Sequence, residues 1–171
     1  MMKKSKKASE SLVIKSEILL PNDTNTLDNL MGGKLMHWMD VVAAISAQKH
    51  SNQQCVTASV DNISFTNPIP LGHVVTLEAQ VTRSFSTSME IHIEVWAEDI
   101  PNHKKFKSNN AFFTFVAIGS DGKPTSVPEV IPETKKEKEF FDSALRRRQL
   151  RLILAGRMKP EDAGELKSIF D

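Results

Sequence analysis

The sequence has a single cysteine, Cys55, among its 171 residues. One cysteine excludes an intrachain disulfide and falls short of the ligands that a thiolate metal site needs. Disulfide-free proteins are typical of the reducing cell interior, so the sequence predicts a reduced, cytoplasmic protein. Cys55 opens an apolar run, which favours a small buried hydrophobic residue over a nucleophile.

Long apolar runs are missing as well. No stretch approaches the ~18 consecutive apolar residues of a membrane helix. Residues 1–7 are rich in lysine, as in a signal peptide, but three polar residues at 15–17 interrupt the apolar run that follows. That run is too short and too charged for a signal core, so we expect residues 1–10 to form a disordered basic tail in solvent. The formal net charge of +1 creates no overall field toward nucleic acid.

Several common catalytic motifs are absent. The chain lacks the Gly-x-Ser-x-Gly elbow, the P-loop and the dinucleotide-binding fingerprint, which argues against a serine hydrolase, a kinase or a dehydrogenase. The five histidines are His37, His50, His73, His92 and His103. Their spacings match no metal motif, so we expect neither a metal nor another cofactor.

The hydrophobic pattern predicts an α+β domain. One strand is expected over residues 12–20 and a helix over residues 34–50. Four strand-like runs follow, and a change of parity in the first of them predicts a bulge near Asp61 and Asn62. The last run is apolar on both faces, as in a central strand. The four runs are residues 55–66, 75–81, 89–97 and 111–118. An antiparallel sheet wrapped around one long buried helix satisfies all of these patterns.

We expect this domain to occupy residues 11–124. Residues 125–133 are rich in proline and predict an extended linker. A helix is expected from about residue 134 to residue 155, with Gly156 as its C-cap. A second short helix is expected over residues 158–170. Residues 125–171 would then form a proline-rich linker and a helical C-terminal extension.

Asp40 is the most informative residue of the sequence. It lies on a predicted helix that is apolar from residue 35 to residue 47 except at three positions, so we expect the helix to be buried on nearly every side. A buried carboxylate is costly unless it has partners, and such groups often mark functional sites. The alternative is a structural carboxylate that holds backbone amides of a neighbouring segment.

Gly32 and Gly33 stand at the start of this helix. Gly33 precedes Asp40 by seven residues, about two turns, so both lie on one helix face. Free N–H groups at a helix start can hold an oxyanion, and a carboxylate two turns along can act on the same carbonyl group. The glycines are also compatible with a plain loop-to-helix turn. Asn25, in the loop of residues 22–29, is a candidate for orienting a water, or an ordinary turn residue.

Three polar segments are weaker candidates. The turn of residues 84–88 can hydrogen-bond a ligand, and Lys104 with two neighbouring lysines forms a predicted basic loop. A second basic cluster, residues 146–148 with Arg151, lies on the predicted tail helix. Either cluster can hold phosphates, although such runs are most often solvated faces. Neither is interleaved with aromatic residues, so nucleic-acid binding gains no support.

A series of motifs resembles one known family. Over about residues 17–124 the sequence resembles the cytosolic acyl-CoA thioesterases of the hot-dog fold, a group that includes brain acyl-CoA hydrolase and the small bacterial acyl-CoA thioesterase. The motifs follow one another at the family's spacing: Asn22-Asp23-Thr24-Asn25, Met31-Gly32-Gly33, Trp38-Met39-Asp40, Val56-Thr57-Ala58-Ser59-Val60-Asp61, Phe65, Pro68, Gly72, Thr87-Ser88-Met89-Glu90, Val95, Ala97-Glu98 and Phe113-Thr114-Phe115-Val116-Ala117.

The resemblance implies hydrolysis of fatty acyl-CoA to a free fatty acid and CoA, with CoA as part of the substrate. It maps the essential acid onto Asp40 and the loop asparagine onto Asn25, acting across a homodimer interface, with trimers of dimers common. The family often has glycine at position 28, so Asp28 is expected to alter the loop around Asn25. The expected substrate- and CoA-binding residues are Thr24, Gly32, Thr57, Ala58, Ser59, Thr87, Ser88 and Lys104.

The mechanism expected from these residues begins with the thioester carbonyl oxygen resting on amides near Gly33. Asp40 then acts as a general base on a water or attacks the carbonyl directly, and Asn25 of the partner chain positions the water. Two alternatives remain. One is a non-enzymatic acyl-CoA-binding regulatory module on the same fold. The other is a hot-dog dehydratase, whose chemistry wants a histidine, and His37 is the only candidate.

Overall fold

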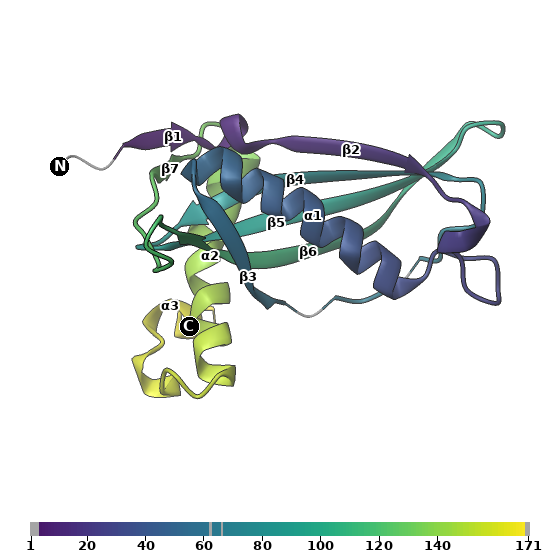
Figure 1. The fold of residues 1–171 in the computed structure, drawn as a ribbon. Helices are drawn as coiled ribbons and strands as arrows, with labels where there is room; N and C mark the ends of the chain where they lie inside the picture. The colour runs from purple at the N-terminus through teal and green to yellow at the C-terminus, as the bar shows by residue number, and fades with distance from the viewer. Residues whose placement is uncertain (1–3, 62, 66, 170–171) are drawn as a thin grey trace.

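The computed structural model describes residues 4–61, 63–65 and 67–169. A curved antiparallel sheet has the long helix α1 (Gly32–Ser51) lying across one face (Figure 1). The strand order is β2-β4-β5-β6-β3. The prediction of an antiparallel sheet wrapped around one helix is confirmed. The strands are β2 (Val13–Ile18), β3 (Gln54–Val60), β4 (Val74–Ser84), β5 (Ser88–Asp99) and β6 (Lys104–Ile118).

The hydrophobic core lies between α1 and the sheet face that it covers. Side chains alternate between the two faces of a strand, so every second residue of β4 and β5 points at the helix. Trp38, Met39 and Val42 of α1 pack onto this face. The buried strand residues of the core include Val75, Leu77, Ala79, Val81, Met89, Ile91, Ile93, Val95, Phe113 and Phe115.

Helix α1 is buried on one side only in the single chain. Met36 is 39% exposed and Ile45 is 44% exposed, at the two margins of the exposed side, which carries Gly33, His37 and the half-buried Asp40 between them. The prediction of a helix buried on nearly every side is therefore wrong for one chain. An apolar surface left open in this way is typical of an interaction site.

Residues 5–11 form a short strand and a 3₁₀ helix, and residues 1–3 of the predicted tail lie outside the described residues. Strand β1 (Ser5–Lys7) pairs in parallel with β7 (Glu129–Ile131), and a 3₁₀ helix, η1 (Ala8–Ser11), follows it. The buried hydroxyl of Ser11 accepts a hydrogen bond from the Val81 amide of β4 at 2.9 Å. The predicted disordered tail over residues 1–10 is thus wrong for residues 5–10, because these residues find backbone and packing partners in distant segments.

Two other expectations fail in detail along β3 and β6. The register irregularity of β3 falls between Thr57 and Ser59, not near Asp61 and Asn62, and Asn62 lies outside the described residues. Lys104, predicted in a loop, begins strand β6 opposite Asp99 of β5. Lysines tolerate this strand end because their side chains still reach solvent.

The C-terminal extension begins with helix α2 (Lys135–Leu154) as predicted. Thr134 caps it: the Thr134 hydroxyl accepts from the Glu137 amide, and the Glu137 carboxylate accepts from the Thr134 amide. The expected second helix over residues 158–170 is shorter. It consists of a 3₁₀ turn, η3 (Pro160–Asp162), and one turn of helix, α3 (Gly164–Lys167), with residue 170 outside the described part.

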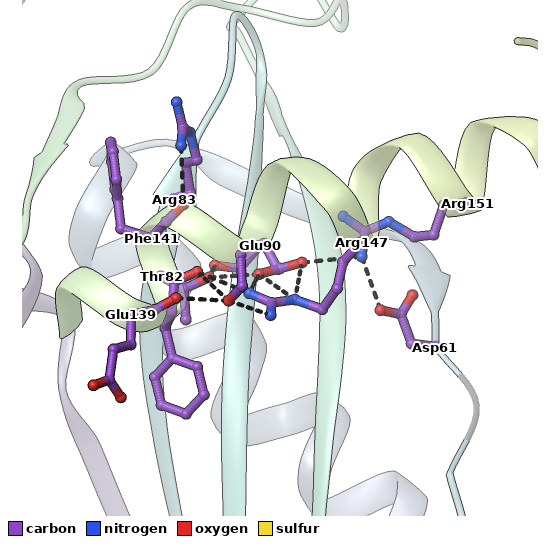
Figure 2. Close-up of polar contacts among 10 residues, drawn as sticks. Asp61, Thr82, Arg83, Glu90, Glu139, Phe141, Arg147 and Arg151 are labelled. Carbon is purple, nitrogen blue, oxygen red and sulfur yellow. Dashed lines mark hydrogen bonds and ion pairs between the residues drawn. The ribbon is translucent and has the colours of Figure 1, made fainter. Parts of the chain in front are cut away.

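A buried ionic network joins α2 to the sheet face opposite α1 (Figure 2). Glu90 of β5 is fully buried, and its carboxylate accepts from Arg147 at 2.7 and 3.0 Å, from Arg151 at 3.0 Å and from the Thr82 hydroxyl at 2.7 Å. Arg151 also contacts Asp61 at 2.8 Å. A buried carboxylate is tolerated only with such partners, so Glu90 fixes where α2 lies.

His92 extends the contact between α2 and the sheet. Its ring lies between Phe112 of β6 and Phe140 of α2, with ring centroids 4.9 and 4.3 Å away. Burial lowers the pKa of His92 to about 4. Burial alone would raise the pKa of neighbouring Glu94, but hydrogen bonds from Lys107 and Lys136 hold it at about 2.

The low pKa of His92 predicts that acid weakens the fold. The unfolded imidazole takes up a proton as the pH falls below about 6.5, whereas the folded imidazole stays neutral down to about 4, so stability is lost between these values. His92→Phe removes this loss. We expect the drop in unfolding free energy between pH 7 and pH 5 to shrink by about 2 kcal/mol, measured by urea unfolding at one protein concentration. An equal drop in both proteins would contradict this role of His92.

Candidate active site

Asp40 lies in the middle of α1, where its carboxylate meets the edge strand β3. The Thr57 hydroxyl donates a hydrogen bond to Asp40 Oδ1 at 2.7 Å. Thr57 pairs with Phe115, a core residue whose side chain faces α1, so the Thr57 side chain points to the same face. Within the described residues, Asp40 Oδ2 has no hydrogen-bond partner. One oxygen is therefore held in place while the other is available for chemistry.

The start of α1 offers free amides two turns before Asp40. The first intrahelical bond runs from the Leu35 amide to the Met31 carbonyl at 3.0 Å, and the amides of residues 32–34 have no partner among the described residues. Met31 at the N-cap position makes no side-chain cap. Free N–H groups at a helix start attract negative charge. This end of α1 can hold an oxyanion, as the sequence predicts.

The two glycines at this helix start differ in their surroundings. A Cβ atom on Gly32 would lie 3.4 Å from the Phe65 ring, at the edge of ordinary contact. A Cβ atom on Gly33 would meet nothing within 4 Å, and Gly33 is exposed. The single chain therefore gives no steric requirement for glycine at either position.

Asn25 lies in the loop that leads to α1. Its Oδ1 accepts from the Leu27 amide at 2.9 Å and from the Asn29 amide at 3.2 Å, which fixes the loop. Asp28 has φ of +54°, in the left-handed region that favours glycine but that aspartate also tolerates. The expected change of loop geometry at Asp28 is thus not found in the backbone, since Asp28 adopts the conformation for which glycine is best suited.

The loop and the helix start line a common pocket of about 380 Å³. Asn25, Gly32 and Phe65 border it, together with the apolar Leu35 and Ile69. The hydroxyl of Thr24, a predicted binding residue, is engaged with the Pro21 carbonyl at 2.8 Å. Thr24 therefore supports the loop, and its hydroxyl already has a partner within it.

Four other predicted binding residues meet at a second pocket, of about 350 Å³, on the sheet face opposite α1. These residues are Ala58, Ser59, Thr87 and Ser88. Arg148 and Arg157 of the C-terminal extension also line this pocket. The basic cluster at residues 146–148 was visible in the sequence, but nothing in the sequence pattern linked Arg157 to these strands.

Lys104 does not join the other predicted binding residues. It pairs with Asp99 at one end of β5, whereas Ser88 lies at the other end, eleven residues away. Eleven strand residues span roughly 36 Å, so within one chain Lys104 and Ser88 lie at opposite ends of the sheet. Lys104 therefore does not share the pocket of Thr87 and Ser88 within one chain, and its role in CoA binding stays a prediction.

Cys55 and the histidines add no second centre. Burial raises the pKa of the half-buried Cys55 thiol, which disfavours the nucleophilic thiolate. No hydrogen bond joins His37 to Asp40 in the part of the chain that the structure describes. Within the same residues, no group of three His, Cys, Asp or Glu side chains is arranged to hold a metal ion. No described helix has the length and apolar content to span a bilayer.

Comparison with known proteins identifies the family. A model of the thioesterase superfamily matches residues 27–102. An uncharacterized acyl-CoA thioester hydrolase of Bacillus subtilis is 41% identical over 138 residues, which are 81% of this chain and 80% of that protein. The chain belongs to the hot-dog-fold acyl-CoA thioesterase family. A cytosolic acyl-CoA thioester hydrolase of the rat is 39% identical over 124 residues. These residues are 71% of this chain but only 32% of that longer protein.

Solved structures of acyl-CoA thioesterases share the fold. The acyl-CoA hydrolase of Staphylococcus aureus, solved with butyryl-CoA, CoA and CoA disulfide, is 38% identical with a TM-score of 0.83, covering 90% of this chain and 95% of that one. A hexameric acyl-CoA thioesterase without ligand has a TM-score of 0.87 and 35% identity, covering 89% of this chain and 97% of that one. The predicted hot-dog fold is confirmed.

Three further structures of the S. aureus hydrolase carry alanine in place of an asparagine, an aspartate or a threonine. The asparagine and the aspartate are 15 residues apart there, and the aspartate and the threonine are 17 apart. Asn25, Asp40 and Thr57 have the same two separations. By this spacing, Asn25, Asp40 and Thr57 align with the three substituted residues of the S. aureus hydrolase.

The bond between Thr57 and Asp40 predicts a positioning role for the hydroxyl. Thr57→Val keeps the shape of the side chain but removes the donor, so we expect kcat on acyl-CoA to fall about 10-fold or more, the cost of one hydrogen bond to a charged group. Thr57→Ser should restore most of the activity. Thr76→Val, which removes a hydroxyl from β4, serves as the control. Equal activity of Thr57→Val and wild type would contradict this role.

Proposed function

We propose that this protein hydrolyses fatty acyl-CoA to a free fatty acid and CoA, with Asp40 as the central catalytic residue. The observation that carries the proposal is the state of the Asp40 carboxylate, with Oδ1 held by Thr57 and Oδ2 open. The 41% identity to an acyl-CoA thioester hydrolase supports the reaction class. Alignment by spacing with the substituted residues of the S. aureus hydrolase supports the choice of Asn25, Asp40 and Thr57.

The proposed reaction uses two parts of α1, the free amides at its start and the Asp40 carboxylate two turns further along. The thioester carbonyl oxygen rests on the free amides near Gly33, where charge develops as the carbonyl carbon is attacked. Asp40 Oδ2 takes a proton from a water, whose oxygen then bonds to that carbon. The carbon–sulfur bond breaks and CoA leaves as a thiolate. Direct attack by the carboxylate, through an anhydride, is the variant that labelled solvent oxygen distinguishes.

We propose that two copies of the chain complete each site. Asn25 and Gly32 share one pocket that Asp40 does not line, and no hydrogen bond joins Asn25 to Asp40 among the described residues. The exposed apolar side of α1, with Met36 and Ile45, supports burial against a second copy. The open space above Gly33 is consistent with close approach of a ligand or a partner. A homodimer, assembled as a trimer of dimers, agrees with the hexameric thioesterase of similar fold.

The alternatives fit the site less well. A dehydratase would need a histidine at the reacting atoms, and His37 is exposed without a hydrogen bond to Asp40 in the described part of the chain. A non-enzymatic acyl-CoA-binding module needs no oriented carboxylate, yet Thr57 orients that of Asp40. We propose that the reaction requires no cofactor. A cytoplasmic location is supported by the single cysteine and the cytosolic rat relative.

Asp40→Asn tests the proposal. The amide cannot accept the proton from water, so we expect kcat to fall by roughly 10²–10⁴-fold while CoA still binds. Thiol release from a series of acyl-CoAs measures the rate, and calorimetry measures CoA binding. Asp142→Asn, at an exposed acid of α2, is the control and should keep full activity.

Two results would contradict the proposal. Wild-type turnover by Asp40→Asn would exclude Asp40 as base or nucleophile. Absence of thiol release by the wild-type protein from every acyl-CoA, with CoA still bound, would favour the regulatory module instead.

A further inference from the structure

A further cavity, of about 260 Å³, lies between the start of α2 and the sheet face opposite α1. Strands β4 and β5, the end of the N-terminal segment at Leu12 and the first turns of α2 all line it. None of the proposed catalytic residues borders it, so it is separate from the site of hydrolysis. The residues that would contact a ligand there are Glu78, Gln80, His92, Glu94, Lys136 and Phe140.

Two carboxylates lie opposite each other in this cavity. Glu78 of β4 is the direct antiparallel partner of Glu94 of β5. Like charges at directly opposite positions destabilise a sheet unless other groups offset them. Lys107 and Lys136 both bind Glu94, each at 2.9 Å, whereas Glu78 forms no ion pair with any described residue. One negative charge on this face of the sheet is therefore left without a partner.

The open polar atoms around these carboxylates are mostly acceptors. Both lysines bind the same oxygen of Glu94, Oε1, and Oε2 accepts no hydrogen bond within the described residues. Gln80 donates through Nε2 to Glu137 at 2.7 Å, and its amide oxygen has no partner in the same part of the chain. Acceptor oxygens together with an unpaired negative charge favour a ligand that carries N–H donors and a positive charge.

His92 gives an independent indication that this cavity takes a ligand. The side chain is only 6% exposed, and its Nε2 is buried without a hydrogen-bond partner among the described residues. A buried polar atom of this kind costs free energy and calls for a partner. The ring lines the cavity beside Gln80, its direct partner on β4. Because burial lowers the pKa of His92, the neutral ring offers one donor and one acceptor and adds no competing charge.

Apolar side chains complete the cavity, so its ligand must have an apolar part. Phe140, Leu12 and Val81 contribute to the lining. Lys136 Nζ lies 5.8 Å from the centre of the Phe140 ring, which shows that a cation can approach this ring. In the described part of the chain, no three His, Cys, Asp or Glu side chains are arranged to hold a metal ion. The lining therefore favours an organic cation over an inorganic one.

We propose that this cavity binds a small organic cation, an ammonium or amidinium group attached to a compact apolar body. The charged group lies between Glu78 and Glu94, with the Gln80 amide oxygen and His92 as further hydrogen-bond partners. The apolar body lies against Phe140. The bound cation offsets the like charges of the two strands and joins α2 to the sheet. This site does not depend on the proposed hydrolysis of acyl-CoA, and either can fail without the other.

Three benzene derivatives of similar shape test the charge that the cavity selects. Benzylamine is a cation at neutral pH, benzyl alcohol is neutral and benzoate is an anion. Ligand-detected NMR on the full-length protein at low salt measures each dissociation constant. We expect saturable binding of benzylamine, and a Kd at least about 10-fold higher for the other two, because they lack the charge-assisted hydrogen bonds. Absence of saturable benzylamine binding, or equal binding of benzyl alcohol, would overturn the inference.

Two variants should change the affinity for benzylamine in opposite directions. Glu78→Gln removes the unpaired carboxylate with little change of shape, so Kd should rise about 10-fold or more. Lys136→Gln removes a cation that competes for Glu94, so Kd should fall. An anion site would show the reverse pair of shifts, and two unchanged Kd values would mean that benzylamine binds elsewhere on the surface. Either result would overturn the inference.

Glu98→Gln is the matched control for the lost charge. Glu98 lies four residues beyond Glu94 on the same face of β5, outside the cavity, so this variant should keep the wild-type Kd. Folding is checked separately by urea unfolding. Glu78→Gln relieves the repulsion between the paired carboxylates, so its unfolding midpoint should be no lower than that of wild type. Weaker binding in that variant then reports the loss of a ligand contact, not the loss of the fold.

Discussion

The packing of α1 against the curved sheet is the constraint on which the site depends. The buried side of the helix, with Met39 and Val42, sets its distance from the strands. That distance brings Asp40 within 2.7 Å of the Thr57 hydroxyl on the edge strand. The same packing leaves the helix start open, where unpaired amides meet the loop of Asn25. Because α1 is buried on one side only, the Asp40 carboxylate lies on a surface of the single chain that also exposes apolar side chains of the helix.

The second face of the sheet is organised by charge. Glu90 is fully buried, and two arginines of α2 neutralise it. Breaking such a pair leaves an uncompensated buried charge, which is strongly destabilising, so α2 has one favoured position. Once Arg147 and Arg151 are engaged, Arg148 is directed to the neighbouring pocket with Phe85. The network therefore explains how a C-terminal helix comes to border residues that lie far earlier in the chain.

Much of this architecture follows from sequence periodicity. Strands β4 and β5 were predictable because alternate residues face the core, and α2 because Thr134 and Glu137 form a capping box. The hydrogen bond between Asp40 and Thr57 could not be predicted from the sequence, since the two residues are seventeen positions apart and meet only through tertiary packing. The order of residues 5–10 also depends on a distant segment, β7. An apolar helix face in a sequence does not reveal whether the same chain or a second copy covers it.

The central claim is that Asp40 of one copy and Asn25 of another serve one thioester. Subunit mixing tests it most directly: Asn25→Ala and Asp40→Asn, each inactive alone, are unfolded together in equal amounts and refolded. Half of the dimers then contain one variant of each kind, and each has one intact site, so the account predicts recovery of about a quarter of wild-type thiol release. Activity no higher than that of either variant refolded alone would contradict a site shared between copies.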